Sequence, residues 1–372
     1  MYFVDRLPCS AGNLPARTRK LRVRTLLQKD TTDLIQSIMR IRLHSSRSSS
    51  DKPLVNNQVM SLFPRRAPKI EEYLDSGSFR LDLMPIIVGA PRSGTTLLRL
   101  MLDSHPALAI PPETGFLKLA TELKGRDHKL RERFVRALVT YPAEAPCWAD
   151  FEISEEALRT AVAAISPFSV AEGYRAFYRL YAGRFGKSRW GDKTPLYCLD
   201  LPAIRKVLPE ARFVHIIRDG RAAALSLKRM WFSPSDRIGE LASYWRNCVL
   251  EARRAGIGSP DYLEVRYEDL ILNAEANLRR ICDFIDLEYD EVMLQYYVRA
   301  PLRLKEHKGR TLSDGTSLVT QEQRIRQQQR TTEPPDPTQI FGWKTVMSAK
   351  ERNEFEGVAG DLLADLGYET EG

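Results

Sequence analysis

PIIVGAPRSGTTLLRLMLDSHPALAIPP, residues Pro85–Pro112, contains an apolar run, a glycine-rich segment and a second apolar pattern in direct succession. Ile86–Val88 consists of β-branched residues, which favour a buried strand. From Leu97 to Leu102, apolar residues recur at the spacing of one helix face. The stretch therefore predicts a strand, a tight loop and a helix.

The loop between these elements is suited to an anion, because the first N–H groups of a helix have no intrahelical partner. Gly94 lets the backbone approach a ligand closely, and the Thr95 and Thr96 hydroxyls can donate to phosphate-like oxygens. The spacing from Gly89 to Gly94 matches the front half of a Walker A loop, but Thr95 stands at the Walker lysine position. Arg92 lies inside the loop, where its guanidinium can face phosphate or sulfate oxygens. A turn that only joins a strand to a helix is the alternative.

Glu113 follows the loop and helix directly. Pro111 and Pro112 precede it and fix an exposed turn, since proline cannot continue a helix. A carboxylate on a rigid loop next to an anion site is unexpected on electrostatic grounds. It makes sense if Glu113 removes a proton from a substrate.

A second segment repeats the arrangement of strand and helix. Arg212–Ile217 is a continuous apolar run after its first residue, typical of a strand buried on both faces of a parallel sheet. Arg218 follows this strand, Asp219 is a candidate helix N-cap, and Ser226 lies two helical turns later. Arg218 and Ser226 are therefore placed where both can reach one phosphate.

The motif PRSGTTLLRLMLDSHP, followed by PPET, resembles the 5′-phosphosulfate-binding segment of sulfotransferases that use 3′-phosphoadenosine 5′-phosphosulfate (PAPS), particularly tyrosylprotein sulfotransferases and their bacterial relatives. RDGRAAALSLKR, from Arg218 to Arg229, resembles the 3′-phosphate-binding motif of that family in residue type and spacing. The resemblance runs from about Met84 to the C-terminus. It implies an α/β fold, with a P-loop-type parallel sheet flanked by helices and a helical cap over the active site.

The resemblance also implies a role for each site residue in sulfuryl transfer from PAPS to an acceptor hydroxyl. Lys193, in WGDKTP, would reach the bridging oxygen, Glu113 would be the general base, and Tyr267, in YEDL, would lie near the nucleotide. The predicted catalytic residues are Glu113, Arg92 and Lys193. The predicted PAPS-binding residues are Arg92, Ser93, Gly94, Thr95, Thr96, Arg218, Ser226 and Tyr267. No metal is expected, because arginine and lysine supply the positive charge.

Other readings stay open for several residues. Without the resemblance, Lys193 is more readily explained as a surface lysine than as a catalytic one. Tyr267 is equally well explained by packing against the sheet edge as by a nucleotide contact. His105 competes with the glutamate as base, although its place before Pro106 favours a capping role. His215, inside a strand, is predicted to be a packed core histidine.

Two other functional classes are alternatives to a sulfotransferase. In a P-loop kinase or nucleotide triphosphatase, Asp219 would end a Walker B strand and hold magnesium, but the missing Walker lysine argues against this. A noncatalytic nucleotide-binding protein would keep the basic groups and show no turnover that depends on Glu113.

Length, composition and charge limit the size of the domain and the kinds of partner that it can have. The 372 residues, 43% of them hydrophobic, are enough for one large α/β domain, and the net charge of +8 favours anionic partners. PAPS accounts for that charge, so no nucleic acid is expected, and the acceptor is predicted to be a small molecule, glycan or peptide with a hydroxyl group. Five cysteines without metal-type spacing, no apolar run long enough for a transmembrane helix and no signal segment predict a cytoplasmic protein.

The chain divides into two parts by composition. Residues 1–75 are basic and rich in serine, which predicts a flexible extension with a short helix at Asp33–Leu43; a targeting peptide or a nucleic-acid-binding arm is the alternative. Residues 76–372 are predicted to form the sulfotransferase domain. Within it we expect a helical cap at about 116–185, because Phe116–Leu138 and Phe151–Gly183 each show continuous helical periodicity. We also expect a mobile loop at about 306–337, where Lys308 and Arg310 are candidate nucleotide contacts.

Overall fold

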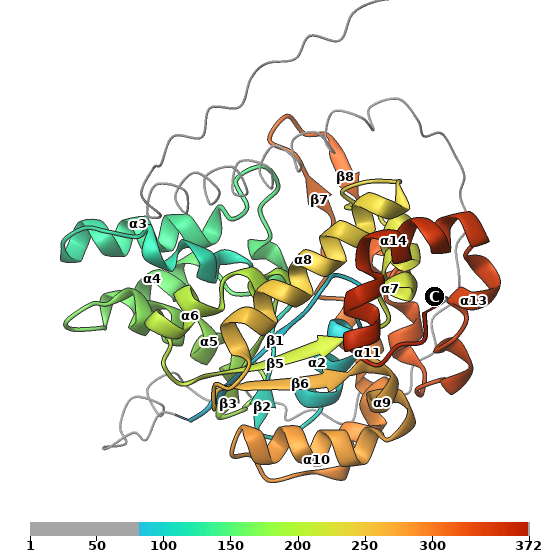
Figure 1. The fold of residues 1–372 in the computed structure, drawn as a ribbon. Coiled ribbons are helices and arrows are strands. Elements are labelled where there is room, and N and C mark those ends of the chain that lie inside the picture. Colours follow the sequence, from blue (N-terminus) through green and yellow to red (C-terminus); the bar gives the residue numbers. More distant parts are fainter. Residues whose placement is uncertain (1–81, 371–372) are drawn as a thin grey trace, which may run out of the picture. The chain divides into compact units, whose positions relative to one another are not determined.

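The computed structural model describes residues 82–370. The predicted extension at residues 1–75, with its helix at Asp33–Leu43, lies outside the described residues. A four-stranded parallel sheet runs through the described part of the chain in the order β4-β1-β5-β6 (Figure 1). Its strands are β1 (Met84–Val88), β4 (Asp192–Lys193), β5 (Ala211–Ile217) and β6 (Tyr262–Arg266).

The two central strands, β1 and β5, are buried on both faces, as their continuous apolar runs predict. Ile87, Val214, Ile216 and Val265 point to one face and share a core with four helices. These helices are α2 (Thr95–Asp103), α9 (Tyr267–Leu272), α10 (Ala274–Phe284) and α11 (Tyr296–Leu304). The predicted parallel α/β sheet is confirmed, and the YEDL segment after β6 begins the helix α9.

A second group of helices covers the sheet on the side where α8 crosses in front of it (Figure 1). These are α6 (Leu201–Val207), α7 (Gly220–Lys228), α8 (Ile238–Gly256) and α14 (Ala349–Asp365). Close packing joins three of them, because a Cβ on Gly220 would lie 2.5 Å from Phe355 and 2.6 Å from Trp245. A capping box formed by Ser348 and Glu351 opens α14. Among residues 82–370, no helix is both long and apolar enough to cross a bilayer.

The segment predicted as a cap contains helices, but these are shorter than expected. Instead of two continuous helical stretches, the chain forms η2 (Phe116–Thr121), α3 (Asp127–Val139), η3 (Trp148–Phe151), α4 (Glu155–Ala163) and α5 (Val170–Gly183). Gly125, with φ 153°, interrupts the first stretch and Pro167 the second. Phe116 holds the segment together, since its ring contacts Phe151 and Tyr174.

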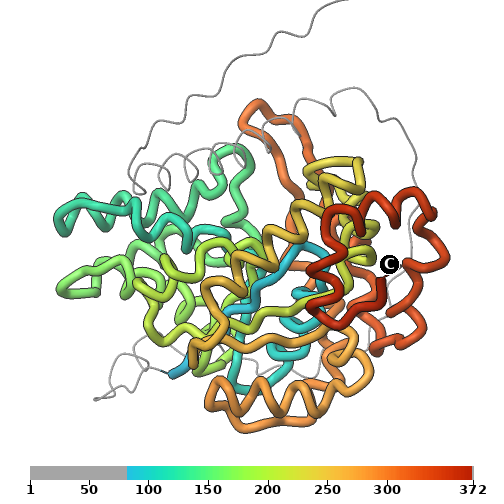
Figure 2. Tube along the Cα trace, viewed as in Figure 1, coloured from blue at the N-terminus to red at the C-terminus, as the bar shows by residue number. Residues whose placement is uncertain are grey.

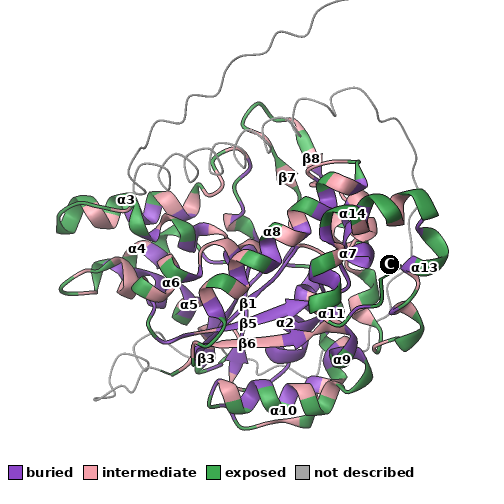
Figure 3. Cartoon of the chain, in the orientation of Figure 1, coloured by how far each residue is buried: buried purple, intermediate pink, exposed green. Residues whose placement is uncertain are grey.

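Short elements complete the described chain. They are the paired strands β2 (Leu108–Ala109) and β3 (Arg189–Trp190), the short helices η4 (Pro195–Leu199), η5 (Glu291–Gln295) and η7 (Pro337–Gln339), and α13 (Trp343–Val346). Figure 3 shows the strands of the main sheet largely buried and the outward faces of the surrounding helices exposed.

Residues 306–337, predicted as an irregular loop, contain regular structure. After α11 the chain forms a hairpin and two short helices, which Figure 2 shows in orange. The elements are β7 (Arg310–Thr311), β8 (Ser317–Val319), α12 (Gln321–Arg326) and η6 (Gln329–Thr332). Gly315, with φ 84°, turns the hairpin, and Thr320 opens α12 with a capping box. The mobility of this segment stays a prediction.

Candidate active site

The predicted site residues meet because all four strands of the sheet are parallel. The glycine-rich loop follows β1, Lys193 ends β4, Arg218 follows β5 and Tyr267 follows β6. The carboxyl ends of parallel strands lie at one edge of a sheet, which is where ligands bind in open α/β folds. Topology therefore brings together residues that are far apart in sequence.

The glycine-rich loop has an unusual backbone conformation. Arg92 and Gly94 have φ values of 71° and 97°, and α2 begins at Thr95 with no side-chain cap. A Cβ on Gly94 would lie 2.4 Å from Cδ2 of Tyr267, so the tyrosine ring packs directly against the loop. Ser93, Thr95 and Thr96 are buried. Glycine is required at position 94 both by the positive φ and by the close approach of Tyr267.

Two arginines meet next to this loop. Nε of Arg92 donates to Oγ of Ser226 at 3.0 Å, and Nη1 of Arg218 donates to the Arg92 carbonyl at 3.2 Å. The Arg218 guanidinium also lies 4.4 Å from the centre of the Tyr267 ring. Within residues 82–370, no carboxylate pairs with either guanidinium at ion-pair distance. Burial, and then the charge of Arg218, lowers the pKa of Arg92, as expected for like charges held together.

Lys193 and Glu113 form an ion pair at the same edge. Nζ of Lys193 lies 2.5 Å from Oε1 of Glu113 and 3.5 Å from Oγ1 of Thr96. The Lys193 side chain is 1% exposed, which excludes a surface lysine, whereas the Glu113 side chain is 52% exposed. β4 therefore places a buried ammonium next to the glycine-rich loop, which has no lysine of its own.

The Lys193 ammonium sets the charge of Glu113. Burial of the carboxyl raises its pKa, whereas Lys193, Arg324 and Arg310 together lower it by more, so the pKa of Glu113 falls below its ordinary value. Burial also lowers the pKa of Lys193. Glu113 is therefore ionised at neutral pH and, being partly exposed, can receive a proton from a bound ligand.

A hydrogen-bonded hub, which we did not predict, holds this pair in place. Asp192 is fully buried and accepts from Thr114 Oγ1 and Tyr178 OH, both at 2.6 Å, and from Thr194 Oγ1 at 2.9 Å. Burial raises the pKa of Asp192 to about 6. Thr114 and Asp192 are the chain neighbours of Glu113 and Lys193, so the hub fixes the loop of one to the strand of the other. In the sequence, the only signal of the hub is the aspartate of WGDKTP.

The histidines and Asp219 take the structural roles that the sequence favours. His105, at the far end of α2, accepts from Ala107 N at Nδ1, and its Nε2 lies 2.9 Å from the Glu288 carbonyl. His215 is fully buried against Tyr262, and burial lowers its pKa to about 3. Asp219 caps α7 and pairs with Arg221.

Lys308 and Arg310, the candidate nucleotide contacts, pair with carboxylates of the cap segment, and their contact with a nucleotide stays a prediction. Nζ of Lys308 lies 2.6 Å from Glu152 Oε1, and Nη2 of Arg310 lies 2.6 Å from Oδ2 of the fully buried Asp150. Residues 306–337 contact the glycine-rich loop at another point. Nη2 of Arg92 donates to the Gln327 carbonyl at 3.3 Å.

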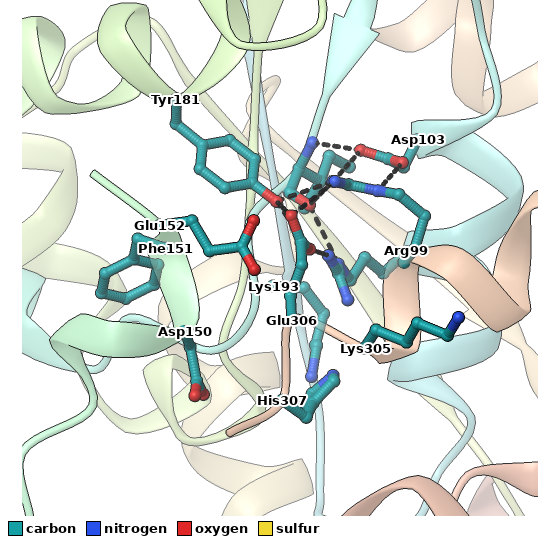
Figure 4. Close-up of polar contacts among 12 residues, drawn as sticks. Arg99, Asp103, Asp150, Phe151, Glu152, Tyr181, Lys193, Lys305, Glu306 and His307 are labelled. Atoms are coloured by element: carbon teal, nitrogen blue, oxygen red, sulfur yellow. Dashed lines mark hydrogen bonds and ion pairs between the residues drawn. The ribbon is translucent and has the colours of Figure 1, made fainter. Parts of the chain in front are cut away.

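A second unpredicted cluster centres on Glu306 (Figure 4). The Glu306 carboxylate accepts from Arg99 at 3.1 Å, from Arg303 at 2.7 Å and from Tyr181 OH at 2.9 Å. Arg303 also donates to Asp103 at 2.7 Å. We call this the Glu306 network; it ties α11 to α2 and α5. No sequence signal marks it, because the partners lie far apart along the chain.

The chain resembles known sulfotransferases over most of its described length. The model of the Sulfotransferase family matches residues 86–291, which is more than half of the chain. Protein-tyrosine sulfotransferase A of Caenorhabditis elegans is 26% identical over 234 residues, which cover 60% of this chain and 54% of that protein. Nodulation protein NoeE of Sinorhizobium fredii is 28% identical over 313 residues, which cover 78% and 67%.

Among solved structures, the sulfotransferase domain of the Synechococcus PCC 7002 olefin synthase matches with 24% identity and a TM-score of 0.47, covering 77% of this chain and 95% of that one. The chain spans about half the length of the C. elegans protein-tyrosine sulfotransferase that it matches. The family match includes the glycine-rich loop, Glu113, Lys193, Arg218 and Tyr267. This protein is therefore a member of the sulfotransferase family.

Proposed function

We propose that this protein transfers the sulfuryl group of PAPS to an acceptor hydroxyl, with Glu113 as the general base. The observation that carries the proposal is the meeting of Arg92, Arg218 and Ser226 at the glycine-rich loop, with two guanidinium groups and no paired carboxylate among the described residues. Such a cluster fits a ligand with several anionic oxygens, and PAPS carries a 3′-phosphate as well as its 5′-phosphosulfate.

Each protein group has a distinct part in the reaction. Arg92 and the N–H groups of Gly94 to Thr96 bind the 5′-phosphosulfate, since the Ser93 N–H already donates to the Ala90 carbonyl. Arg218 and Ser226 bind the 3′-phosphate. PAPS supplies the activated sulfuryl group. Lys193 donates to the bridging oxygen, which keeps the electron pair of the sulfur–oxygen bond as it breaks. Glu113 takes the proton of the acceptor hydroxyl as the acceptor oxygen bonds to sulfur.

The acceptor is a molecule that can bring a hydroxyl to the exposed side of Glu113. Relatives named protein-tyrosine sulfotransferases support a peptide. A glycan and a small molecule stay candidates from the sequence. The cytoplasmic location and the absence of a metal requirement stay predictions.

Calorimetric titration of the full-length protein tests the cosubstrate. We expect tight binding of 3′-phosphoadenosine 5′-phosphate (PAP) with no added metal, and little binding of ATP with magnesium. The opposite preference would replace the proposal with a kinase or nucleotide triphosphatase. If neither nucleotide bound, the fold would have been kept without its cosubstrate.

A further inference from the structure

His307 is a buried histidine that is held rigidly from both sides. It follows Glu306, whose carboxylate is fixed by the Glu306 network, and precedes Lys308, whose backbone N–H donates to Oδ1 of Asp150 at 2.9 Å. The residue itself is 6% exposed. Figure 4 shows its ring next to the end of the Lys193 side chain, whose charge acts on it. A side chain anchored in this way has a fixed direction.

The hydrogen-bond pattern fixes the tautomer of His307. Nδ1 lies 3.0 Å from Nη2 of Arg324, and a guanidinium can only donate, so Nδ1 is the acceptor. Burial, and then the charge of Arg324, holds the pKa of His307 well below its usual value, so the ring is neutral. The remaining proton is therefore on Nε2.

Nε2–H has no acceptor in the described part of the chain, although the atom is buried. An unsatisfied buried donor costs roughly 1–3 kcal/mol, so such a group calls for a partner. The charges of Lys193, Arg310 and Arg324 all act on His307, and Lys193, Arg324 and Arg310 also act on Glu113. The orphan donor thus belongs to the same charged region as the proposed reaction centre.

The missing partner has to accept a hydrogen bond and to tolerate several nearby cations. A sulfuryl group meets both conditions, because it has only acceptor oxygens and is negatively charged. An acceptor hydroxyl fits less well, since Glu113 already accounts for its proton.

We propose that Nε2–H of His307 donates a hydrogen bond to a sulfuryl oxygen of bound PAPS. This inference rests on the proposed function and deepens it by naming the residue that recognises the transferred group. His307 is not a general base in this arrangement, because its Nε2 already carries a proton. Its contact would orient the sulfur toward the acceptor oxygen and stabilise charge on the equatorial oxygens.

The test compares the affinities of PAPS and PAP, which differ by the sulfuryl group. His307→Asn keeps an acceptor near the position of Nδ1 and removes the Nε2–H donor. His307→Gln instead places an amide N–H near the position of Nε2. We expect His307→Asn to weaken PAPS binding by roughly 10- to 100-fold and to leave PAP binding unchanged. His307→Gln should retain most of the PAPS affinity. Lys305→Ala, an exposed neighbour, is the matched control and should change neither.

A second measurement avoids substitution altogether. The Nε2–H proton resonance of His307 should shift on addition of PAPS to the wild-type protein and stay in place with PAP. Equal shifts with both nucleotides, or equal losses of both affinities in His307→Asn, would overturn the inference and leave His307 a structural residue. If the wild-type protein bound neither nucleotide, the proposed function itself would be wrong. If it bound both nucleotides and His307→Asn weakened them equally, only the role of His307 would be wrong.

Discussion

Arg92 and Arg218 lie at the carboxyl ends of the strands, which we call the strand edge. Their partners differ in kind from those of the arginines in the Glu306 network. Arg92 donates to a serine hydroxyl and a backbone carbonyl, and Arg218 donates to the carbonyl of Arg92. Arg99 and Arg303 donate instead to carboxylates, at 3.1 Å and 2.7 Å. Both sets lie within one domain and come partly from the same helix and its preceding loop.

The difference shows which charges are available for a ligand. A guanidinium paired with a carboxylate is neutralised already, and removal of either partner leaves an uncompensated buried charge. A guanidinium with only neutral partners keeps its charge for an anion. We therefore expect the network to control stability and the strand edge to control binding and catalysis.

Identical substitutions of Glu113 and Glu306 give the largest expected contrast. Glu113→Gln removes the proposed base, and we expect PAP release from PAPS in the presence of an acceptor to fall by about 10²- to 10⁴-fold. PAP binding should change little, and the melting temperature should fall less than in Glu306→Gln, because a glutamine at position 113 can still accept a hydrogen bond from the buried Lys193. Glu306→Gln should instead lower the melting temperature strongly. A normal rate in Glu113→Gln would show that another group takes the proton.

Replacement of one arginine from each set separates binding from stability. Arg303→Met removes the ion pair of the buried Asp103 and one of the ion pairs of Glu306, and we expect a loss of about 3–5 kcal/mol in the free energy of unfolding. Arg92→Met removes one of two like charges, so stability should be kept while PAP affinity falls. Urea unfolding and calorimetry measure the two effects. Equal destabilisation by both variants would remove the distinction between the two sets.

Arg218→Ala sharpens the comparison within the strand edge. We expect PAP binding to weaken by roughly 10- to 100-fold, because a charged hydrogen-bond donor to the 3′-phosphate is lost. Adenosine 5′-monophosphate, which lacks that phosphate, should bind as before. Arg212→Ala, on the preceding strand, is the control, since the Arg212 side chain donates to the carbonyl of Ala211. Equal losses for both nucleotides would argue against a 3′-phosphate site.

Lys193→Met gives the subtlest expected effect, a displacement of the pH profile. Glu113 has to be ionised to act as a base, so the rate falls as pH drops through its pKa. Lys193 lowers that pKa, while burial raises it. Without Lys193 the pKa of Glu113 rises, and the acid limb of PAP release against pH should move to higher pH, in addition to a lower maximal rate. An unmoved acid limb would mean that Glu113 does not set it.

Local sequence patterns alone determined the strand, loop and helix at Pro85–Pro112 and the second strand and helix around Arg218. They did so because hydrophobic periodicity and glycine placement report on the neighbouring backbone. Short motifs likewise indicated Glu113 and Lys193. The boundaries of the cap helices were predicted less accurately. Gly125 and Pro167 interrupt stretches whose hydrophobic periodicity predicts continuous helices.

The tertiary structure alone decided which of these residues touch. Arg92 and Ser226 are 134 positions apart, and Arg99 and Glu306 are 207 apart. Contacts over such separations depend on strand order and helix packing, and they leave no periodic trace in the sequence. The burial of Lys193, the Asp192 hub and the orphan donor of His307 therefore became visible only in the folded chain, where the low dielectric of the interior makes each partner matter.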